Sequence, residues 1–431
     1  MHAALRLGYE GTARLARLGA SLTRWVPNAE AKVVRALRAR NGIRERYRTW
    51  GARYRDPSRP LLWMHAPSVG EGLQARPILE LMRRLHPEVQ LAYTHYSPSA
   101  EKFAHSLDVD FRDYLPFDSS PDSRVALAAL RPTALVFSKL DVWPTLTRLA
   151  AEEGVHLGLV SATLASQSSR RSRLAAAILR DAYAALDVVG AIDPADASRL
   201  VDLGVHADRI VITGDTRYDQ VWQRAQHADR TKPVLARVAS PCLTIVAGST
   251  WPADEHALLP AFAALRRAGT IARLIIAPHE PTAAHLTPIE RWAAGDGLSL
   301  ARLDGATATT DVVLVDRVGV LGDLYALADV AFVGGGFHAA GLHSVLEPAA
   351  FGTPVLFGPR HAASRDALLL VSHGGGRAVA GAPALIEALT MWLTDSAARR
   401  EAGARAQTVV REGLGAAERS LAVLEQLLLL A

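Results

Sequence analysis

The sequence has 431 residues, of which 49% are hydrophobic, so it is long enough for roughly two or three domains that each bury a core. Its single cysteine, Cys242, excludes an internal disulfide and fits a reducing compartment. The net charge of +5 is uneven, because residues 1–60 carry fourteen Lys or Arg against four Asp or Glu. This asymmetry predicts an anionic partner near the N-terminus, either a membrane or a nucleic acid.

The N-terminal segment, residues 1–40, has the pattern of an amphipathic helix that lies in a lipid interface. Its apolar face consists of Leu7, Leu15, Leu18, Leu22 and Trp25, and its opposite side of Arg6, Arg17 and Arg24, with Arg14 nearby. The arginines exclude a spanning helix, and the segment has no unbroken apolar core of a secretory signal. The alternative is an ordinary amphipathic helix packed on the protein. A nucleic-acid partner is not expected, because no aromatic-rich basic module accompanies the charge.

Short apolar runs, each followed by a helical pattern, recur along the chain. In the first half these runs are residues 61–66, 89–96, 134–138, 156–162, 188–192 and 210–214. After the polar stretch 226–233 they restart with residues 243–249, 273–279, 312–316, 330–336 and 354–359. Continuous apolar strands that alternate with helices predict parallel sheets covered on both faces. We therefore predict an α/β chain of two doubly wound, Rossmann-like domains, 41–230 and 231–431, with a terminal helix in the second.

Two such domains in tandem predict an interdomain cleft at the carboxyl ends of their strands, where ligands bind. The first strand-end loop is HAPSVGEG, residues 65–72, in which Ser68 and Glu71 have the spacing of a capping box. A carboxylate at a helix start is also stabilised by the helix dipole, by about 0.3–1 kcal/mol. Alternatively, Glu71 is a general base that takes a proton from an attacking hydroxyl. The spacing leaves both roles open.

A second constellation lies in residues 332–359. The glycines Gly334, Gly335 and Gly336 follow a strand, and a helix is predicted to begin near Gly341 or His343. Backbone N–H groups at a helix N-terminus bind phosphate without a basic side chain. Glu347, about one turn into that helix, could accept hydrogen bonds from ribose hydroxyls. The alternative is a plain tight turn.

Three further strand ends carry polar groups. Ser249 and Thr250 could cap the following helix or hold a phosphate oxygen. Lys139 and Asp141 could pair with each other on the surface, where such a pair is worth little, or present a cation to an anionic ligand. Arg217 could act in the same way. No histidine spacing predicts a zinc site, and no phosphate-binding P-loop or G-x-S-x-G elbow occurs.

The order of these motifs resembles that of the 3-deoxy-D-manno-octulosonic acid (Kdo) transferases, which add Kdo to the lipid A precursor of Gram-negative bacteria. The matching motifs are SVGE, a W-P segment, G-D-T-R, A-G-S-T, G-x-L-x-x-L-Y-x-x-A-D-V-A-F-V-G-G and H-x-x-L-E-P-A-x-x-G-x-P-V-L-F-G-P, within roughly residues 40–425. The resemblance implies a GT-B fold, an inverting mechanism, CMP-Kdo as donor, no catalytic metal or other cofactor, and N-terminal attachment to the cytoplasmic face of the inner membrane.

The resemblance also implies roles by position. Glu71 matches the proposed catalytic base of the family. The residues expected on the donor side are Gly248, Ser249, Thr250, His279, Gly319, Gly335, Gly336, Gly341, His343, Ser344 and Glu347. The residues expected to bind the acceptor or the Kdo carboxylate are Ser68, Gly70, Lys139, Asp141 and Arg217.

Four features depart from the usual family pattern. His279 stands where an arginine often sits, and Lys139 and Asp141 stand at two positions that are often acidic. Ser344 replaces an asparagine that often follows the histidine. The usual apolar N-terminal anchor is replaced by an arginine-studded helix. The alternatives to a Kdo transferase are a GT-B glycosyltransferase that uses a UDP-sugar, a non-catalytic relative that binds a sugar nucleotide, and a sugar-nucleotide epimerase.

Overall fold

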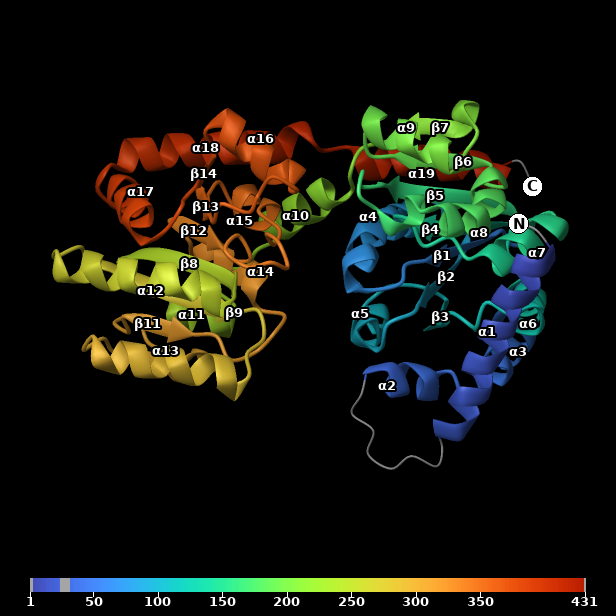
Figure 1. The fold of residues 1–431 in the computed structure, drawn as a ribbon, viewed down its shortest axis with the longest axis horizontal. Coiled ribbons are helices and arrows are strands. Elements are labelled where there is room, and N and C mark those ends of the chain that lie inside the picture. Colours follow the sequence, from blue (N-terminus) through green and yellow to red (C-terminus); the bar gives the residue numbers. More distant parts are fainter. Residues whose placement is uncertain (1–2, 24–31, 430–431) are drawn as a thin grey trace. The chain divides into compact units, whose positions relative to one another are not determined.

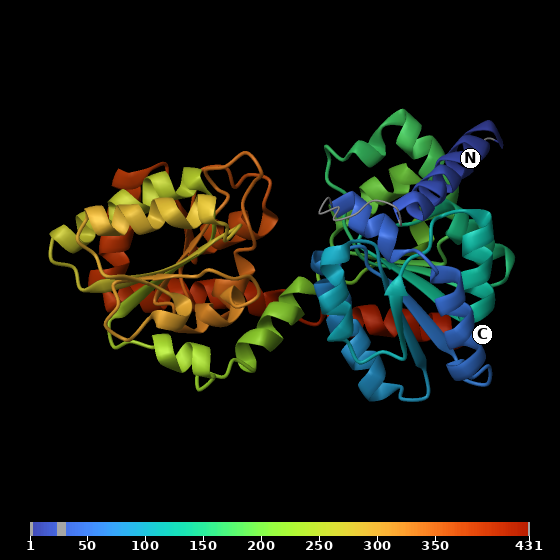
Figure 2. The ribbon, with the colours of Figure 1, turned by 90° about the horizontal axis from the view of Figure 1, so that it is seen from below.

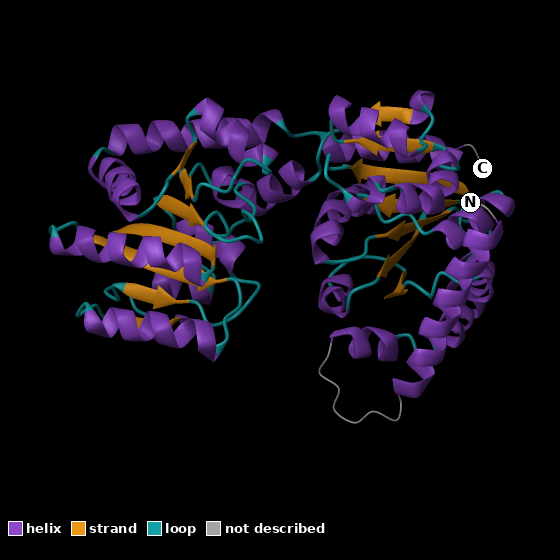
Figure 3. Cartoon of the chain, viewed as in Figure 1, coloured by secondary structure: helices purple, strands orange, loops and turns teal. Residues whose placement is uncertain are grey.

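The computed structural model describes residues 3–23 and 32–429, which fold into two compact units (Figure 1). The first unit contains the chain up to residue 220 together with residues 414–431, and the second contains residues 221–413. Figure 3 shows the strands of each unit as orange arrows between purple helices. The predicted pair of doubly wound α/β domains is confirmed. The interdomain cleft stays a prediction.

The first unit is built on a parallel sheet. Its strands are β1 (Leu61–His65), β2 (Gln90–His95), β3 (Phe111–Tyr114), β4 (Ala134–Ser138), β5 (His156–Ala162), β6 (Val188–Ala191) and β7 (Ile210–Ile212). Within the described residues they form a seven-stranded sheet in the order β3-β2-β1-β4-β5-β6-β7. All the strand pairs are parallel. Every residue of β1, β2 and β4 is buried, which is why these strands have continuous apolar runs.

Helices cover both faces of this sheet (Figure 2). They are α1 (Ala3–Leu22), α2 (Lys32–Ala39), α3 (Ile43–Tyr54), α4 (Val69–Leu85), α5 (Glu101–His105), α6 (Ser120–Leu130), α7 (Pro144–Glu152), α8 (Arg173–Ala184), α9 (Pro194–Leu203) and α19 (Ala416–Leu429). Successive strand side chains point to opposite faces. Leu61 and Trp63 therefore share a core with α3, α6 and α7, whereas Leu62 and Met64 share one with α4, α5 and α19.

The second unit repeats this plan. Its strands are β8 (Leu243–Thr250), β9 (Ala272–Pro278), β10 (Leu300–Arg302), β11 (Val312–Leu314), β12 (Val330–Val333), β13 (Val355–Phe357) and β14 (Gly376–Ala378), in the order β10-β11-β9-β8-β12-β13-β14. Its helices are α11 (Pro233–Val238), α12 (Pro252–Arg267), α13 (Ala283–Gly295), α14 (Leu321–Leu324), α15 (Leu346–Ala350), α16 (Arg365–His373), α17 (Ala382–Thr394) and α18 (Ser396–Glu412). Helix α10 (Arg217–Gln226) spans the division between the units.

The strand prediction missed only short strands near the sheet margins. β3 and β10 are edge strands, and so is β14. Each contains an arginine, namely Arg112, Arg302 or Arg377. An edge strand has one paired side and more contact with solvent, so it tolerates charge and does not need a continuous apolar run.

The terminal helix α19 belongs to the first unit, which corrects the predicted 231–431 domain. Leu421, Leu424 and Leu427 are buried in the core face formed by β1, β4 and β5. The carboxylate of Asp219 accepts hydrogen bonds from the N–H groups of Gly415 (2.8 Å) and Ala417 (2.9 Å) at the start of the helix. In Figure 1 this helix, in red, lies beside the green strand β5. The chain returns because its apolar face is needed to cover the first sheet.

The placement of α19 can be tested with Leu424→Ala. Because this side chain is fully buried, its truncation should destabilise the first unit by about 2–5 kcal/mol and speed amide hydrogen exchange in β5 and α4. The control Leu85→Ala, at a position that is 55% exposed, should change stability by less than about 0.5 kcal/mol. Faster exchange confined to residues 221–413 would contradict the assignment.

Candidate active site

A carboxylate and an amine meet at the carboxyl edge of the first sheet. Glu71 lies in the first turn of α4, after β1, and Lys139 follows the neighbouring strand β4. Lys139 Nζ lies 3.3 Å from Glu71 Oε1, and the hydroxyl of Ser68 donates to Glu71 Oε2. Ser68 is the N-cap of α4, as its spacing predicted, and its Oγ also accepts the N–H of Gly70 at 3.2 Å. The structure therefore brings together four of the predicted residues.

This arrangement keeps the Glu71 carboxylate ionised. Burial alone would raise the pKa of Glu71, but the hydrogen bond from Ser68 and the positive charge of Lys139 lower it below the ordinary value. The Glu71 side chain is 18% exposed and that of Lys139 is 42% exposed, so solvent and solutes can reach the pair. An ionised, accessible carboxylate can accept a proton.

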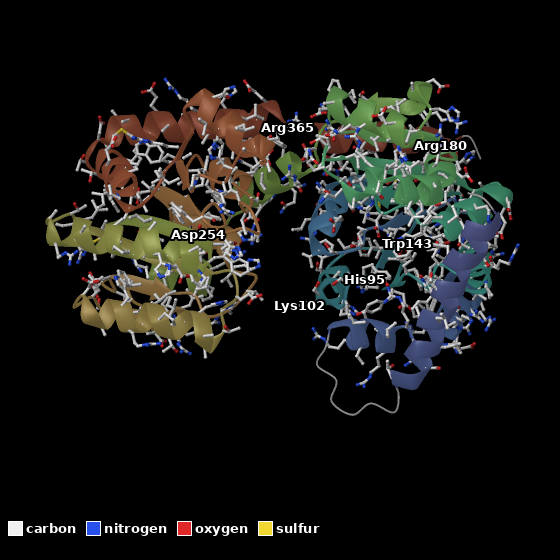
Figure 4. The ribbon with its side chains drawn as sticks, in the orientation of Figure 1. His95, Lys102, Trp143, Arg180, Asp254 and Arg365 are labelled. Atoms are coloured by element: carbon white, nitrogen blue, oxygen red, sulfur yellow. The ribbon has the colours of Figure 1, made fainter. Side chains whose placement is uncertain are left out.

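Asp141 does not pair with Lys139, so the surface pair, one of the two alternatives for these residues, is not the one observed. Its carboxylate accepts the indole N–H of Trp143 at 3.0 Å, and lies 3.5 Å from Nε2 of the buried His65 and 3.3 Å from Arg170. Burial would raise the pKa of Asp141, but the hydrogen bond with His65 and the charge of Arg170 lower it. Figure 4 labels Trp143 within the first unit. Asp141 thus organises a second polar group at the same edge of the sheet.

Arg217 is engaged by a neighbouring carboxylate. Its Nε and Nη2 atoms lie 2.8 and 2.6 Å from Asp215 Oδ2. Asp215 Oδ1 lies 3.4 Å from the side-chain nitrogen of Gln74, which is one turn beyond Glu71 on α4. The loop after β7 is thereby tied to the helix that carries Glu71, although β7 is at the far edge of the sheet.

In the second unit, the glycine-rich turn after β12 encloses a buried carboxylate. The N–H groups of Gly335 and Phe337 donate to Asp254 at 2.7 and 3.0 Å, and that of Trp251 donates to it at 2.9 Å. Gly335 has φ +89, and a Cβ there would lie 2.2 Å from the carbonyl oxygen of Gly341, so only glycine fits. Asp254, labelled in Figure 4, is fully buried. The Gly335 N–H is therefore not free for a phosphate.

The helix predicted to begin near Gly341 or His343 begins later. Helix α15 spans only Leu346–Ala350, and residues 341–344 form a loop. Gly341 has φ +92, which ends any regular helix there. A helix of five residues cannot supply the anion site that the motif suggested. Pro348 lies within its first turn, where proline is tolerated.

Four aromatic side chains cluster at the carboxyl edge of the second sheet. Trp251 follows β8, His279 follows the adjacent strand β9, and His338 and His343 follow β12 on the other side of β8. The Trp251 ring stacks on His338 at 4.4 Å and on His279 at 4.6 Å, and His279 stacks on His343 at 4.5 Å. The indole N–H of Trp251 donates to His343 Nε2 at 3.2 Å. The structure thus brings His279 and His343 together, as members of one ring cluster.

Two further predicted donor residues have structural partners. The hydroxyl of Thr250 is buried and donates to the carboxylate of Glu255, in the first turn of α12, at 2.9 Å. Glu347 is near Arg224 and Asp323, and its pKa is raised chiefly by burial, with Arg224 opposing and Asp323 reinforcing the shift.

Among the remaining predicted donor residues, Gly248 and Ser249 lie at the end of β8, and the others lie in turns and loops. Gly248 fits beneath Tyr325, whose hydroxyl would lie 2.1 Å from an added Cβ. Ser249 has φ +55, an uncommon value for a residue other than glycine. Gly336 packs against Gly358, where a Cβ would lie 2.4 Å from the backbone nitrogen. Gly319 follows β11, and Ser344 is exposed in the loop before α15.

The sequence analysis missed several residues that lie beside Glu71 and Asp141 in the first unit or in the ring cluster of the second unit. His65, Trp143 and Trp251 were present within the motifs HAPSVGEG, SKLDVWPTL and AGSTWPADE, so an aromatic residue beside a strand end was the available signal. Asp254 follows Trp251 by three residues, the spacing of a cap. No nearby sequence pattern predicted a role for Arg170 or Arg224, because their long side chains reach elements that are distant in the sequence.

The N-terminal helix α1 is held on the first unit by its polar side. The hydroxyl of Tyr9 donates to Asp118 at 2.8 Å, and the Arg17 guanidinium lies 3.6 Å from Asp122. Ala20 is buried on the same side. Arg17, predicted to belong to a solvated basic side, instead forms an ion pair within the protein.

The opposite side of α1 exposes leucines. Leu15 and Leu18 are 66% and 61% exposed. The side chains of Leu7, Leu22, Trp25, Arg6, Arg14 and Arg24 lie outside the described residues. None of the helices formed by residues 3–23 and 32–429 combines the length and apolar character needed to cross a bilayer.

Comparison with known proteins places the chain in one family. A family model described as "3-Deoxy-D-manno-octulosonic-acid transferase (kdotransferase)" matches residues 41–220. The 3-deoxy-D-manno-octulosonic acid transferase of Bordetella pertussis is 30% identical over 398 residues, which cover 87% of this chain and 89% of the relative. That of Haemophilus influenzae is 25% identical over 409 residues, which cover 91% and 92%.

Solved structures share the fold at lower identity. UDP-GlcNAc 2-epimerase from Neisseria meningitidis, bound to UDP-GlcNAc, has a TM-score of 0.63 and 13% identity, covering 85% of this chain and all of the epimerase. A glycosyltransferase from Rickettsia africae has a TM-score of 0.56 and 11% identity, covering 86% and 99%. At these identities the likeness shows the fold alone, and with the two parallel sheets it confirms the predicted GT-B class.

Proposed function

We propose that this protein takes Kdo from CMP-Kdo and adds it, with inversion, to a hydroxyl of a lipid A precursor. The premise is that the chain belongs to the Kdo transferase family and is a glycosyltransferase that transfers Kdo. The observation that carries this proposal is the Glu71 carboxylate, kept ionised by Ser68 and Lys139 at the carboxyl edge of the first sheet. Ligands of doubly wound domains bind at that edge.

Glu71 acts as the general base. The acceptor hydroxyl attacks the anomeric carbon of Kdo, the bond from that carbon to the phosphate oxygen breaks, and CMP leaves with the bonding electrons. Glu71 takes the hydroxyl proton as the new bond forms. Attack from the face opposite CMP inverts the configuration. Turnover requires that the acceptor near Glu71 and the donor's anomeric carbon come together.

The strand ends of the second unit bind the donor. A helix N-terminus favours an anion, but the first turn of α12 already carries the carboxylates Asp254 and Glu255, which offset the dipole. We therefore assign the phosphate chiefly to side-chain donors, namely Ser249, His279 and His343. The turn around Gly248, Gly335 and Gly336 shapes the space for CMP, and Gly319, Gly341, Ser344 and Glu347 stay candidates for the nucleoside. As the family resemblance implies, we expect no metal or other cofactor.

Cations of the first unit bind the anionic parts of both substrates. The Lys139 ammonium is 42% exposed, so it can contact the Kdo carboxylate or an acceptor phosphate while it remains near Glu71. Arg217 stays oriented by Asp215. Gly70 leaves space beside Ser68. Apart from the adjoining backbone, Ser68 Oγ at 3.8 Å is the one heavy atom of the described residues within 4 Å of an added Cβ. Asp141, next to buried His65, orients the loop rather than the substrate.

The first prediction from the proposed function concerns Glu71 as the general base. Glu71→Gln removes the proton acceptor with little change in shape, so transfer should fall by a factor of about 10²–10⁴. The reaction with CMP-Kdo and lipid A precursor is followed by mass spectrometry of the lipid product. Glu80→Gln, at an exposed position on the same helix, is the matched control and should keep full activity.

If folded Glu71→Gln transfers Kdo at a rate within about tenfold of that of wild type, another residue must act as the general base. Thermal stabilisation by CMP-Kdo and not by UDP-sugars would separate the proposed donor from the UDP-sugar alternative. Product formation would exclude a non-catalytic relative. An unchanged lipid together with an epimerised sugar nucleotide would favour an epimerase.

The second prediction concerns pH. Because the Lys139 charge helps to lower the pKa of Glu71, Lys139→Met should raise that pKa. The carboxylate would then be protonated at a higher pH, so the acid limb of kcat against pH should shift upward. Lys102→Met, at an exposed lysine of α5, is the control (Figure 4). Identical acid limbs in Lys139→Met and wild type would show that Lys139 does not tune the base.

The third prediction concerns the membrane. We propose that the exposed leucines of α1 enter the cytoplasmic face of the inner membrane, each contributing up to about 1.5–3 kcal/mol, while basic residues of the segment 1–40 add about 1 kcal/mol each at an anionic surface. The double variant Leu15→Gln, Leu18→Gln should weaken sedimentation with anionic vesicles at least about tenfold. Leu174→Gln, at a leucine that is 63% exposed on α8, should bind as wild type does. Equal vesicle binding by wild type, the double variant and Leu174→Gln would contradict membrane attachment through the α1 leucines.

A further inference from the structure

We infer that Trp251 is a positioning residue that fixes His343 as the neutral tautomer with its proton on Nδ1, so that this imidazole donates a hydrogen bond to a phosphate oxygen of the bound nucleotide. The tautomer follows from the geometry of the free protein, whereas the use of that donor rests on the proposed function.

The tautomer is decided by the type of group that faces His343. An indole nitrogen is a donor only, so the 3.2 Å contact from Trp251 Nε1 requires a lone pair on His343 Nε2. In a neutral imidazole the other nitrogen then holds the proton. Among the residues that the structure describes, His343 Nδ1 has no hydrogen-bond partner. Its N–H is therefore available to a ligand that accepts hydrogen bonds.

The two rings are held in place by their neighbours. Trp251 is stacked on His338, with an angle of 10° between the ring planes, and on His279, with an angle of 27°. His279 also stacks on His343, so it contacts both partners of the hydrogen bond. The backbone N–H of Trp251 donates to Asp254, and that of His343 donates to the carbonyl of Gly334 at 3.1 Å. These contacts pre-organise the Nδ1–H before the nucleotide binds.

The surroundings also favour the neutral ring. Protonation of Nε2 would turn a second N–H toward the indole N–H, which loses the hydrogen bond. Burial lowers the pKa of His343, and the nearby His279 and His338 lower it further, while Asp254 opposes them. Asp254 already accepts three backbone N–H groups. On the α13 side, His285 faces Trp251 at 6.4 Å. His343 therefore acts near neutral pH as an uncharged donor.

The tautomer is measured first in the unaltered protein. Nitrogen-15 NMR of the imidazole rings, with the His343 signals assigned by their loss in His343→Gln, should show a protonated Nδ1 and an unprotonated Nε2. A protonated Nε2 in the free protein would overturn the inference without any further variant.

The variant Trp251→Phe keeps a ring in the stack but removes the indole N–H. His343 should then populate the other tautomer, and the dissociation constant for CMP and KM for CMP-Kdo should rise about two- to tenfold, as expected for the loss of one oriented hydrogen bond, with kcat nearly unchanged. The CMP phosphate itself titrates at about pH 6, and in this variant the dependence of CMP affinity on pH between about pH 6 and 8 should differ from that of wild type. Trp292→Phe is the matched control, because its buried Nε1 has no hydrogen-bond partner among the described residues.

Different results would contradict the two parts of the hypothesis, namely the tautomer fixed by Trp251 and the use of His343 in nucleotide binding. An unchanged His343 tautomer in Trp251→Phe would overturn the positioning role of Trp251. A changed tautomer with unchanged CMP affinity would overturn the donor-binding role assigned to His343 under the proposed function.

Discussion

Each sheet of this protein consists of parallel strands whose central members are largely buried on both faces, and the chemistry depends on that constraint. Parallel strands place all their carboxyl ends at one edge, so the side chains that can reach a ligand lie at the strand ends and in the loops that follow them. Glu71 and Lys139 therefore meet although they are 68 residues apart, because β1 and β4 are neighbours. Trp251 and His343, 92 residues apart, meet because β8 lies beside β12.

Buried and accessible carboxylates have different partners, and the difference separates structural from functional roles. The buried Asp118 and Asp254 each accept backbone N–H groups at the start of a helix or within a turn. Such groups are fully engaged by the backbone and fix the loops. Glu71 instead bonds two side chains, Ser68 and Lys139, both of which can rearrange. An accessible carboxylate with movable partners can exchange a proton without disturbing the fold.

Left-handed backbone conformations occur at a strand end in each of the two units. Lys139 has φ +69 directly after β4, and Ser249 has φ +55 near the end of β8. Left-handed conformations of such residues cost of order 1 kcal/mol or more and persist only where the surroundings enforce them. Lys139 and Ser249 each lie beside a group that we assign to catalysis or donor binding, whereas Arg131 and Ser161, which also have positive φ, do not.

The sequence by itself determined the two series of buried strands and the strand-end position of Glu71, because these follow from hydrophobic runs and from spacings within a few residues. It also placed Ser68 as a helix cap. The GT-B class came from the resemblance of its motifs to a known family. Only the tertiary structure decided that Lys139 pairs with Glu71 and not with Asp141, that Asp254 fills the glycine turn, and that α19 returns to the first unit. Those outcomes depend on which strands are neighbours in a sheet and on how far long side chains reach. A pattern along the sequence contains neither kind of information, because it does not give the distance between residues that are far apart in the chain.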